Sequence, residues 1–272
     1  MIDRPSFLTS TFAAVIALVA AACSGSASKS QAVTTRPRTT STLPPTTAAT
    51  TTSPAPTTTT ADPGTPARFV ERGTSALPPR VAFIFHTGLG DPGLVLRLLG
   101  AAKGATVPMT LMVIGHWLET HPAVASAIHA SRNEIGSHTY SHQALLQLSP
   151  AQAQLEIQRG ADVLQRLLGI KGLWLRPSGT EVSATSAVVN AAAGKVGYPV
   201  VLGFDVNPTD NGDPGAAAVE QRVLAAIQPG AIASLHSGHQ GTIDALGPLA
   251  ASIRARGYEL VKVSDIVDPG RE

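Results

Sequence analysis

The chain has 272 residues, a formal net charge of +2 at pH 7 and one cysteine, and 43% of its residues are apolar. A charge this close to zero argues against a nucleic-acid partner, and a single cysteine excludes an intramolecular disulfide and a Cys-rich zinc module. The length allows one large domain or two small ones. These values are averages over segments of the chain that differ in composition.

Residues 1–22 have the features of a secretory signal peptide. Arg4 precedes the apolar run 12–22, which is too short to cross a bilayer as a helix. Cys23 follows three alanines and precedes small residues, and this arrangement resembles a bacterial lipobox, although Ala20 stands where Leu is usual. The resemblance implies cleavage before Cys23, lipid attachment to Cys23, and a lipid-anchored protein that faces the cell wall. An ordinary signal peptide and a secreted protein are the alternative.

Residues 23–66 have the composition of a disordered linker. Threonine, proline and alanine dominate this stretch, and no acidic residue occurs between Asp3 and Asp62. Such a segment has too little apolar side-chain volume to offset the entropy lost on ordering. We expect an extended stalk that holds the remaining domain away from the membrane.

We expect the protein to be a monomer.

Residues 67–272 read as one globular α/β domain. Short apolar runs predict buried strands at 80–85, 106–114, 134–136, 173–175, 200–202, 231–235 and 260–263. Helical patterns separate them at 91–103, 117–131, 149–168, 183–195, 215–227 and 243–256. This alternation implies a parallel sheet with helices outside it, and seven or eight strands favour a small barrel over an open sheet. Chemistry in such barrels lies at the carboxyl ends of the strands.

Polar side chains follow the predicted strands at those ends. The segment 134–142 reads EIGSHTYSH, so that His138 and His142 are four residues apart directly after a strand. The other polar residues at strand ends are His86, Thr87, Arg176, Asp205, Asn207, Asp210 and His236.

The EIGSHTYSH segment resembles the second motif of the NodB-homology polysaccharide deacetylases, carbohydrate esterase family 4. The resemblance extends to residues 112–117 (MVIGHW) and 145–154 (LLQLSPAQAQ), and it covers nearly all of residues 80–266. It implies a distorted (β/α)7-type barrel that removes N- or O-acetyl groups from a cell-envelope glycan, such as peptidoglycan, with a divalent metal, often Zn²⁺.

The resemblance also implies roles for individual residues. His138 and His142 would be metal ligands, since two neutral imidazoles at this spacing can reach one ion. His236 would be the general acid that protonates the leaving group, and Asp210 would tune it, because a carboxylate partner raises the basicity of imidazole. Arg176 would orient the catalytic carboxylate.

The first motif departs from the family. Where the family has T-F-D-D-G, with a general base followed by a metal ligand, this chain has His86 and Thr87 in place of both aspartates. His86 could replace the base, since imidazole titrates near neutrality. Thr87 is a poor substitute for an anionic ligand. Ser178–Thr180 and Asn211 replace aromatic residues of the third and fourth motifs.

Three alternatives follow from these departures. The domain could bind glycan without hydrolysing it. It could be a working deacetylase in which Asp91 swings in or in which His86, His138 and His142 form a three-His zinc site. It could also be a metal hydrolase that acts on another bond. Neighbouring residues on a strand point to opposite faces, and in the family the second position of this motif meets the metal. The resemblance therefore argues against the three-His site and implies that His86, at the first position, faces the substrate water. We further expect Asp91 to be a helix N-cap and His239 to be a loop residue rather than a metal ligand.

Overall fold

The structure is a computed structural model that describes residues 64–270. The signal peptide, the lipidation at Cys23 and nearly all of the linker 23–66 lie outside the described residues and stay predictions. Among residues 64–270, no helix is both long and apolar enough to cross a membrane.

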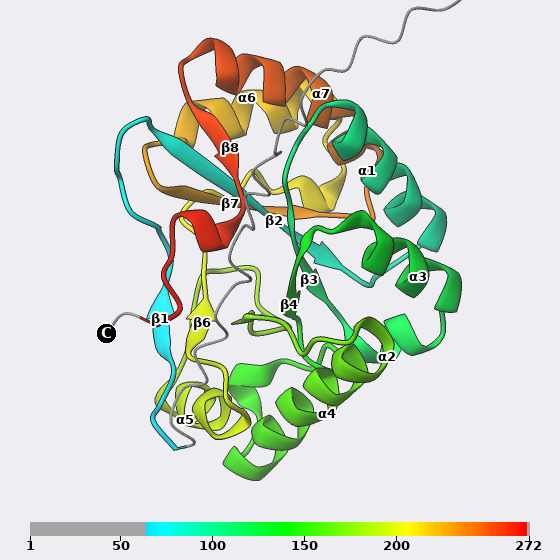
Figure 1. Cartoon of the computed structure of the whole chain (residues 1–272), viewed down its shortest axis with the longest axis vertical. Helices are drawn as coiled ribbons and strands as arrows, with labels where there is room; N and C mark the ends of the chain where they lie inside the picture. Colours follow the sequence, from blue (N-terminus) through cyan, green and yellow to red (C-terminus); the bar gives the residue numbers. More distant parts are fainter. Residues whose placement is uncertain (1–63, 271–272) are drawn as a thin grey trace, which may run out of the picture. The chain divides into compact units, whose positions relative to one another are not determined.

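A parallel sheet forms the centre of the domain (Figure 1). Its strands follow the order β1-β6-β5-β4-β3-β2-β7, and β8 pairs with the first residues of β2. Every pairing between these strands is parallel. The strands are β1 (Arg68–Val70), β2 (Arg80–Thr87), β3 (Thr110–Val113), β4 (Glu134–Ser137), β5 (Trp174–Leu175), β6 (Val200–Leu202), β7 (Ala231–His236) and β8 (Glu259–Val261).

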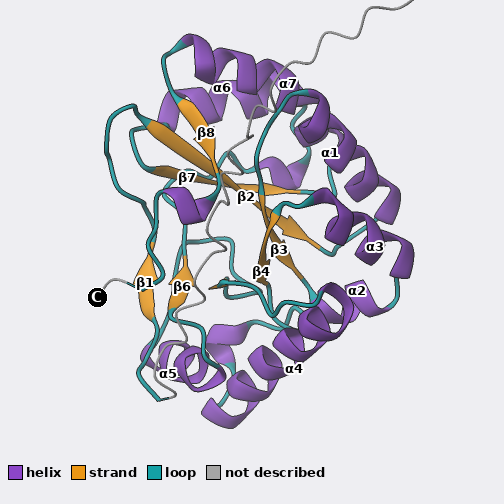
Figure 2. Ribbon diagram, viewed as in Figure 1, coloured by secondary structure: helices purple, strands orange, loops and turns teal. Residues whose placement is uncertain are grey.

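Helices surround this sheet on its outer side (Figure 2). They are α1 (Pro92–Gly104), α2 (Gly115–Glu119), α3 (Pro122–Ser131), α4 (Pro150–Leu168), α5 (Ala187–Val196), α6 (Ala216–Ala226) and α7 (Gln240–Ala255). The predicted α/β barrel fold is therefore confirmed, in the form of a half-barrel. In the part of the chain that the structure describes, the end strands β1 and β7 do not pair with each other, and a single bridge between Val206 and Ala233 extends the sheet beyond β7.

Two predicted elements have different bounds because of proline. The single helix expected at 117–131 is two helices, α2 and α3, with His121 in a non-helical conformation between them. Pro122 disfavours the helical conformation at the preceding residue and suits the first turn of the next helix. The strand expected at 106–114 begins only at Thr110, since Pro108 cannot donate a hydrogen bond to a strand ladder. Strand β1 was not predicted.

Helix α4 follows the sequence prediction closely. Ser149 is the N-cap of a capping box with Gln152, and Gly169 ends the helix in the left-handed region. The predicted apolar stripe is buried: Ala153, Ile157, Ala161, Leu164 and Leu168. The same face presses on the segment after β4, where a Cβ added at Gly160 would lie 2.8 Å from the carbonyl carbon of Thr139. Helix α4 therefore supports the segment that carries His138 and His142.

Strand alternation decides which side chains face the inside of the half-barrel. Ala82 and Ile84 of β2 pack in the interior cluster with Met112, Trp174 and Ile232, whereas Phe83 and Phe85 pack against the outer helices. Successive side chains of a strand point to opposite faces. His86 on β2, Ser234 and His236 on β7, and Arg176 after β5 continue the inward-facing rows.

Candidate functional site

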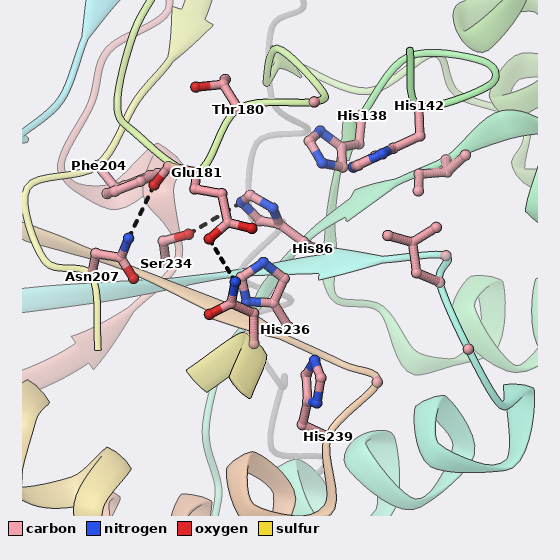
Figure 3. Close-up of a pocket in the computed structure, with 17 residues that line it drawn as sticks. His86, His138, His142, Thr180, Glu181, Phe204, Asn207, Ser234, His236 and His239 are labelled. Atoms are coloured by element: carbon pink, nitrogen blue, oxygen red, sulfur yellow. Dashed lines mark hydrogen bonds between the residues drawn. The ribbon is translucent and has the colours of Figure 1, made fainter. Parts of the chain in front are cut away.

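A cavity of ≈ 580 Å³ opens at the carboxyl ends of the strands. His86, His138, His142 and His236 all line it, so the structure brings together four of the six residues that the sequence predicted as catalytic or metal-binding. Figure 3 shows His86 between the His138–His142 pair and His236. The other two predicted residues, Arg176 and Asp210, are buried and contact His138 and His236 through hydrogen bonds.

His86 occupies the middle of the imidazole cluster. Its ring centroid lies 4.5 Å from that of His138 and 4.7 Å from that of His236, because β2 and β7 pair with His86 opposite His236. Its Nε2 is 3.2 Å from the hydroxyl of Ser234. Burial, and then the neighbouring histidines, hold the pKa of His86 well below its ordinary value. His86 is therefore neutral at pH 7, and the prediction that it faces the pocket is confirmed.

In the histidine pair of the second motif, His138 has a fixed tautomer. The Nδ1–H of His138 donates to the backbone carbonyl of Arg176 at 3.0 Å, which leaves the lone pair on Nε2. That Nε2 is buried and has no hydrogen-bond partner among the described residues. The ring of His142 is 4.9 Å away, and burial lowers the pKa of both histidines. A buried acceptor without a partner is rare in folded proteins and indicates a place for a ligand.

The His236 side of the pocket has a complete hydrogen-bond network. Asp210 is fully buried and accepts from the Nδ1 of His236 at 2.8 Å, from the backbone N–H of His236 at 2.8 Å and from the hydroxyl of Thr242 at 2.7 Å. The carboxylate fixes the tautomer of His236 and presents its Nε2 to the pocket. This geometry suits a group that delivers a proton to a leaving amine or alkoxide.

Arg176 is a buried cation without a carboxylate partner. Its Nη2 donates to the backbone carbonyls of Val182 at 3.1 Å and of Thr180 at 3.4 Å, while Nε and Nη1 have no partner among the described residues. Burial lowers the pKa of Arg176 to about 10. Because His86 stands where the family has a carboxylate, the expected role of Arg176 in orienting that carboxylate has no counterpart here.

The donor set around the histidine pair is incomplete for a metal of the family type. Thr87 is buried and donates its hydroxyl to the carbonyl of Phe85 at 3.0 Å, so it does not supply the missing ligand. Within residues 64–270, no group of three or more His, Cys, Asp or Glu side chains is arranged to hold a metal ion. The three-His alternative has no support among the described side chains and stays a prediction. Metal binding by His138 and His142 alone stays a prediction.

Asp91 does not supply the missing carboxylate. It is exposed, and its Oδ1 accepts from the backbone N–H of Gly93 at 2.8 Å, which confirms it as the N-cap of α1. His239 lies in the loop directly before α7, as expected, and it also lines the pocket, with its ring 6.1 Å from that of His236.

The sequence analysis missed one carboxylate at the pocket. Glu181 lines the cavity, and its Oε2 accepts from the Nδ2 of Asn211 at 2.6 Å. The signal was present, since Glu181 directly follows Ser178–Thr180, which replaces the aromatic residue of the third motif. No periodic pattern marks a loop residue of this kind, so only its position in space identifies it.

Comparison with known proteins agrees with this geometry. The polysaccharide deacetylase family matches residues 75–201. An uncharacterized protein, YlxY, of Bacillus subtilis is 26% identical over 193 residues, which cover 71% of this chain and 59% of YlxY. The chain thus spans less than two thirds of that relative. A peptidoglycan-N-acetylglucosamine deacetylase of Bacillus cereus is 26% identical over 196 residues, which cover 71% of this chain and 70% of the enzyme.

Solved structures share the fold. A pseudoenzyme of carbohydrate esterase family 4 from Bacillus anthracis superposes with a TM-score of 0.68 at 22% identity and covers 75% of this chain and 70% of its own. A mutant of that protein with restored enzymatic activity superposes with a TM-score of 0.68, also at 22% identity, and covers 75% and 73%. Taken with the half-barrel, the HTYSH segment and the His236–Asp210 pair, these similarities show that the chain carries a NodB-homology polysaccharide deacetylase domain.

Proposed function

We propose that this domain binds an amino-sugar glycan of the cell envelope in the pocket, and that its hydrolytic centre is incomplete. The observation that carries the proposal is the donor set: two imidazoles without the carboxylates that the family places at positions 86 and 87. The fold and the His236–Asp210 pair resemble those of a deacetylase and support a glycan as the ligand. The peptidoglycan deacetylases among the relatives support peptidoglycan as the glycan.

The proposed location is the outer side of the membrane. Lipid at Cys23 would hold the chain there, and the linker 23–66 would let the domain reach the wall glycan. The side chains that line the site all come from one chain, so we propose that it acts as a monomer.

A second candidate function is deacetylation itself, and the complete network around His236 favours it. His236 would protonate the leaving nitrogen, and Asp210 would stabilise the imidazolium that exists before this transfer. His86 is neutral and lies between the metal-ligand pair and His236, where it could accept the proton of an attacking water. A divalent ion, when bound, would polarise the acetyl carbonyl. This candidate requires the two-imidazole site to retain an ion.

The two candidates differ in acetate release. We expect purified full chain, supplied with Zn²⁺ and N-acetylglucosamine oligomers, to bind the oligomers and to release no acetate above the blank. The double variant His86→Asp/Thr87→Asp restores both carboxylates, so it should bind about one metal ion per chain and release acetate. His236→Ala in that background should abolish the release. Acetate release by the natural sequence that depends on His236 would instead establish the second candidate.

A further inference from the structure

The permanently charged side chains among the described residues that line the pocket are of one sign. Glu181 is the one carboxylate among the described lining residues, and no lysine or arginine lies among them. Its Oε2 contacts Asn211, while Oε1 has no partner among the described residues. A charged ligand that complements these lining residues is therefore a cation.

Three contacts fix Glu181 at the rim. The Nδ2 of Asn207 donates to the backbone carbonyl of Glu181 at 3.1 Å, in addition to the bond between Asn211 and the carboxylate. Arg176 holds the same loop from the interior through the carbonyl of Val182 at 3.1 Å. Figure 3 shows the Glu181 side chain directed over the cavity, near His236 and His86. Asn211 thus holds the carboxylate, while Asn207 and Arg176 hold the loop that carries it.

A second observation, independent of Glu181, also indicates a donor ligand. The Nε2 of His138 is buried, unpartnered and part of the pocket lining, and its lone pair is free because Nδ1 donates to the Arg176 carbonyl. The Nε2 of His236 is available in the same way, because Nδ1 donates to Asp210.

We infer that the pocket binds a sugar that carries a free amino group, with the ammonium paired to Glu181 and the imidazole acceptors. This inference rests on the proposed glycan binding and specifies its ligand. An N-acetyl group removes the positive charge and two of the three N–H donors, so the acetylated sugar leaves the carboxylate without a counter-charge. N-deacetylation of the glycan is the class of reaction that supplies such a ligand. This domain would therefore recognise glycan that has already been deacetylated.

The test compares two ligands of equal length. Calorimetric titration of the full chain, in EDTA to remove divalent ions, uses β-1,4-linked glucosamine oligomers and the matching N-acetylglucosamine oligomers. We expect the free-amine oligomer to bind at least ~10-fold more tightly, since a charged pair in a partly enclosed pocket is stronger than its neutral counterpart. Glu181→Gln keeps the shape and the acceptor for Asn211, and it should reduce that preference to within about twofold.

The control separates local charge from overall charge. Glu259→Gln removes one negative charge on β8, which pairs with the opposite end of β2, and it should leave the preference intact. Equal binding of both oligomers, or tighter binding of the acetylated one, overturns the inference while glycan binding stands. Binding of neither oligomer contradicts the proposed function itself. A preference that survives in Glu181→Gln removes Glu181 from the site.

Discussion

The two sides of the pocket differ in how well their buried polar groups are paired. On the β7 side, Asp210 accepts three hydrogen bonds, two of them from His236. On the β2–β4–β5 side, the Nε2 of His138 and two nitrogens of Arg176 have no partner among residues 64–270. His86 and Thr87 lie on this second side, and neither offers a carboxylate to the unpaired groups. Loss of a carboxylate leaves the groups that served it unpaired, while the remote acid pair is unaffected.

The largest expected effect on stability comes from disrupting the hydrogen-bond network around Asp210 on the β7 side. Asp210→Ala removes a buried acceptor and leaves the N–H groups of His236 and the hydroxyl of Thr242 unsatisfied, so we expect a loss of about 3–5 kcal/mol in the free energy of unfolding. Urea denaturation of the variant and the natural chain measures it. A loss below about 1 kcal/mol would show that this network is not a stable part of the fold.

Lowering the pH should reduce the folding stability through the buried histidines on the β2–β4–β5 side of the pocket. The pKa values of His86 and His138 are lowered in the folded state, so below the unfolded value of about 6.5 the unfolded chain binds more protons than the folded one. Stability is therefore full above pH 6.5 and falls as the pH drops, by up to about 1.4 kcal/mol per pH unit for each histidine.

Thermal unfolding between pH 7.5 and 5 checks this expectation. His138→Gln should reduce the steepness of the decline by roughly a third, since it removes one of the three histidines whose pKa is lowered in the folded state. His116→Gln, at an exposed position on α2, is the matched control and should leave the decline unchanged. A melting temperature that is flat across this range would contradict the expectation.

A carboxylate at position 86 should form an ion pair with the buried guanidinium of Arg176. His86→Asp provides the partner that Arg176 lacks, so the pair should be coupled by about 1–3 kcal/mol in a double-mutant cycle with Arg176→Met. In the natural chain, Arg176→Met alone should cost much less than Asp210→Ala, because an unpaired buried guanidinium contributes little net stability. Additive effects in the cycle would mean that positions 86 and 176 do not interact.

The smallest expected effect concerns the support of the histidine pair. Gly160→Ala on α4 places a Cβ 2.8 Å from Thr139 and 3.0 Å from the hydroxyl of Ser137, and it should cost about 1–3 kcal/mol. Gly100→Ala on α1 is the matched control, since nothing lies within 4 Å of the added carbon. That control should gain about 0.5–1 kcal/mol from its higher helix propensity. Equal effects of the two changes would show that α4 does not position His138.

Much of the fold was predictable because its signals are local. The capping box at Ser149 and the apolar stripe from Ala153 to Leu168 fix helix α4 within one element. The short apolar runs fix seven strands in the same way, and their alternation with helices implies parallel pairing. Proline at 108 and 122 is also a local signal, and reading it more strictly would have corrected two element boundaries.

The sequence alone also determined the chemistry of the individual residues: two histidines four apart, a further histidine with an aspartate upstream, and the loss of both first-motif carboxylates. The tertiary structure alone decided how these groups meet. It paired His86 with His236 across adjacent strands, turned the Thr87 hydroxyl to Phe85, and brought Glu181 over the cavity. The reason is physical: side-chain type and period are local properties, whereas hydrogen-bond partners and burial depend on segments far apart in the chain.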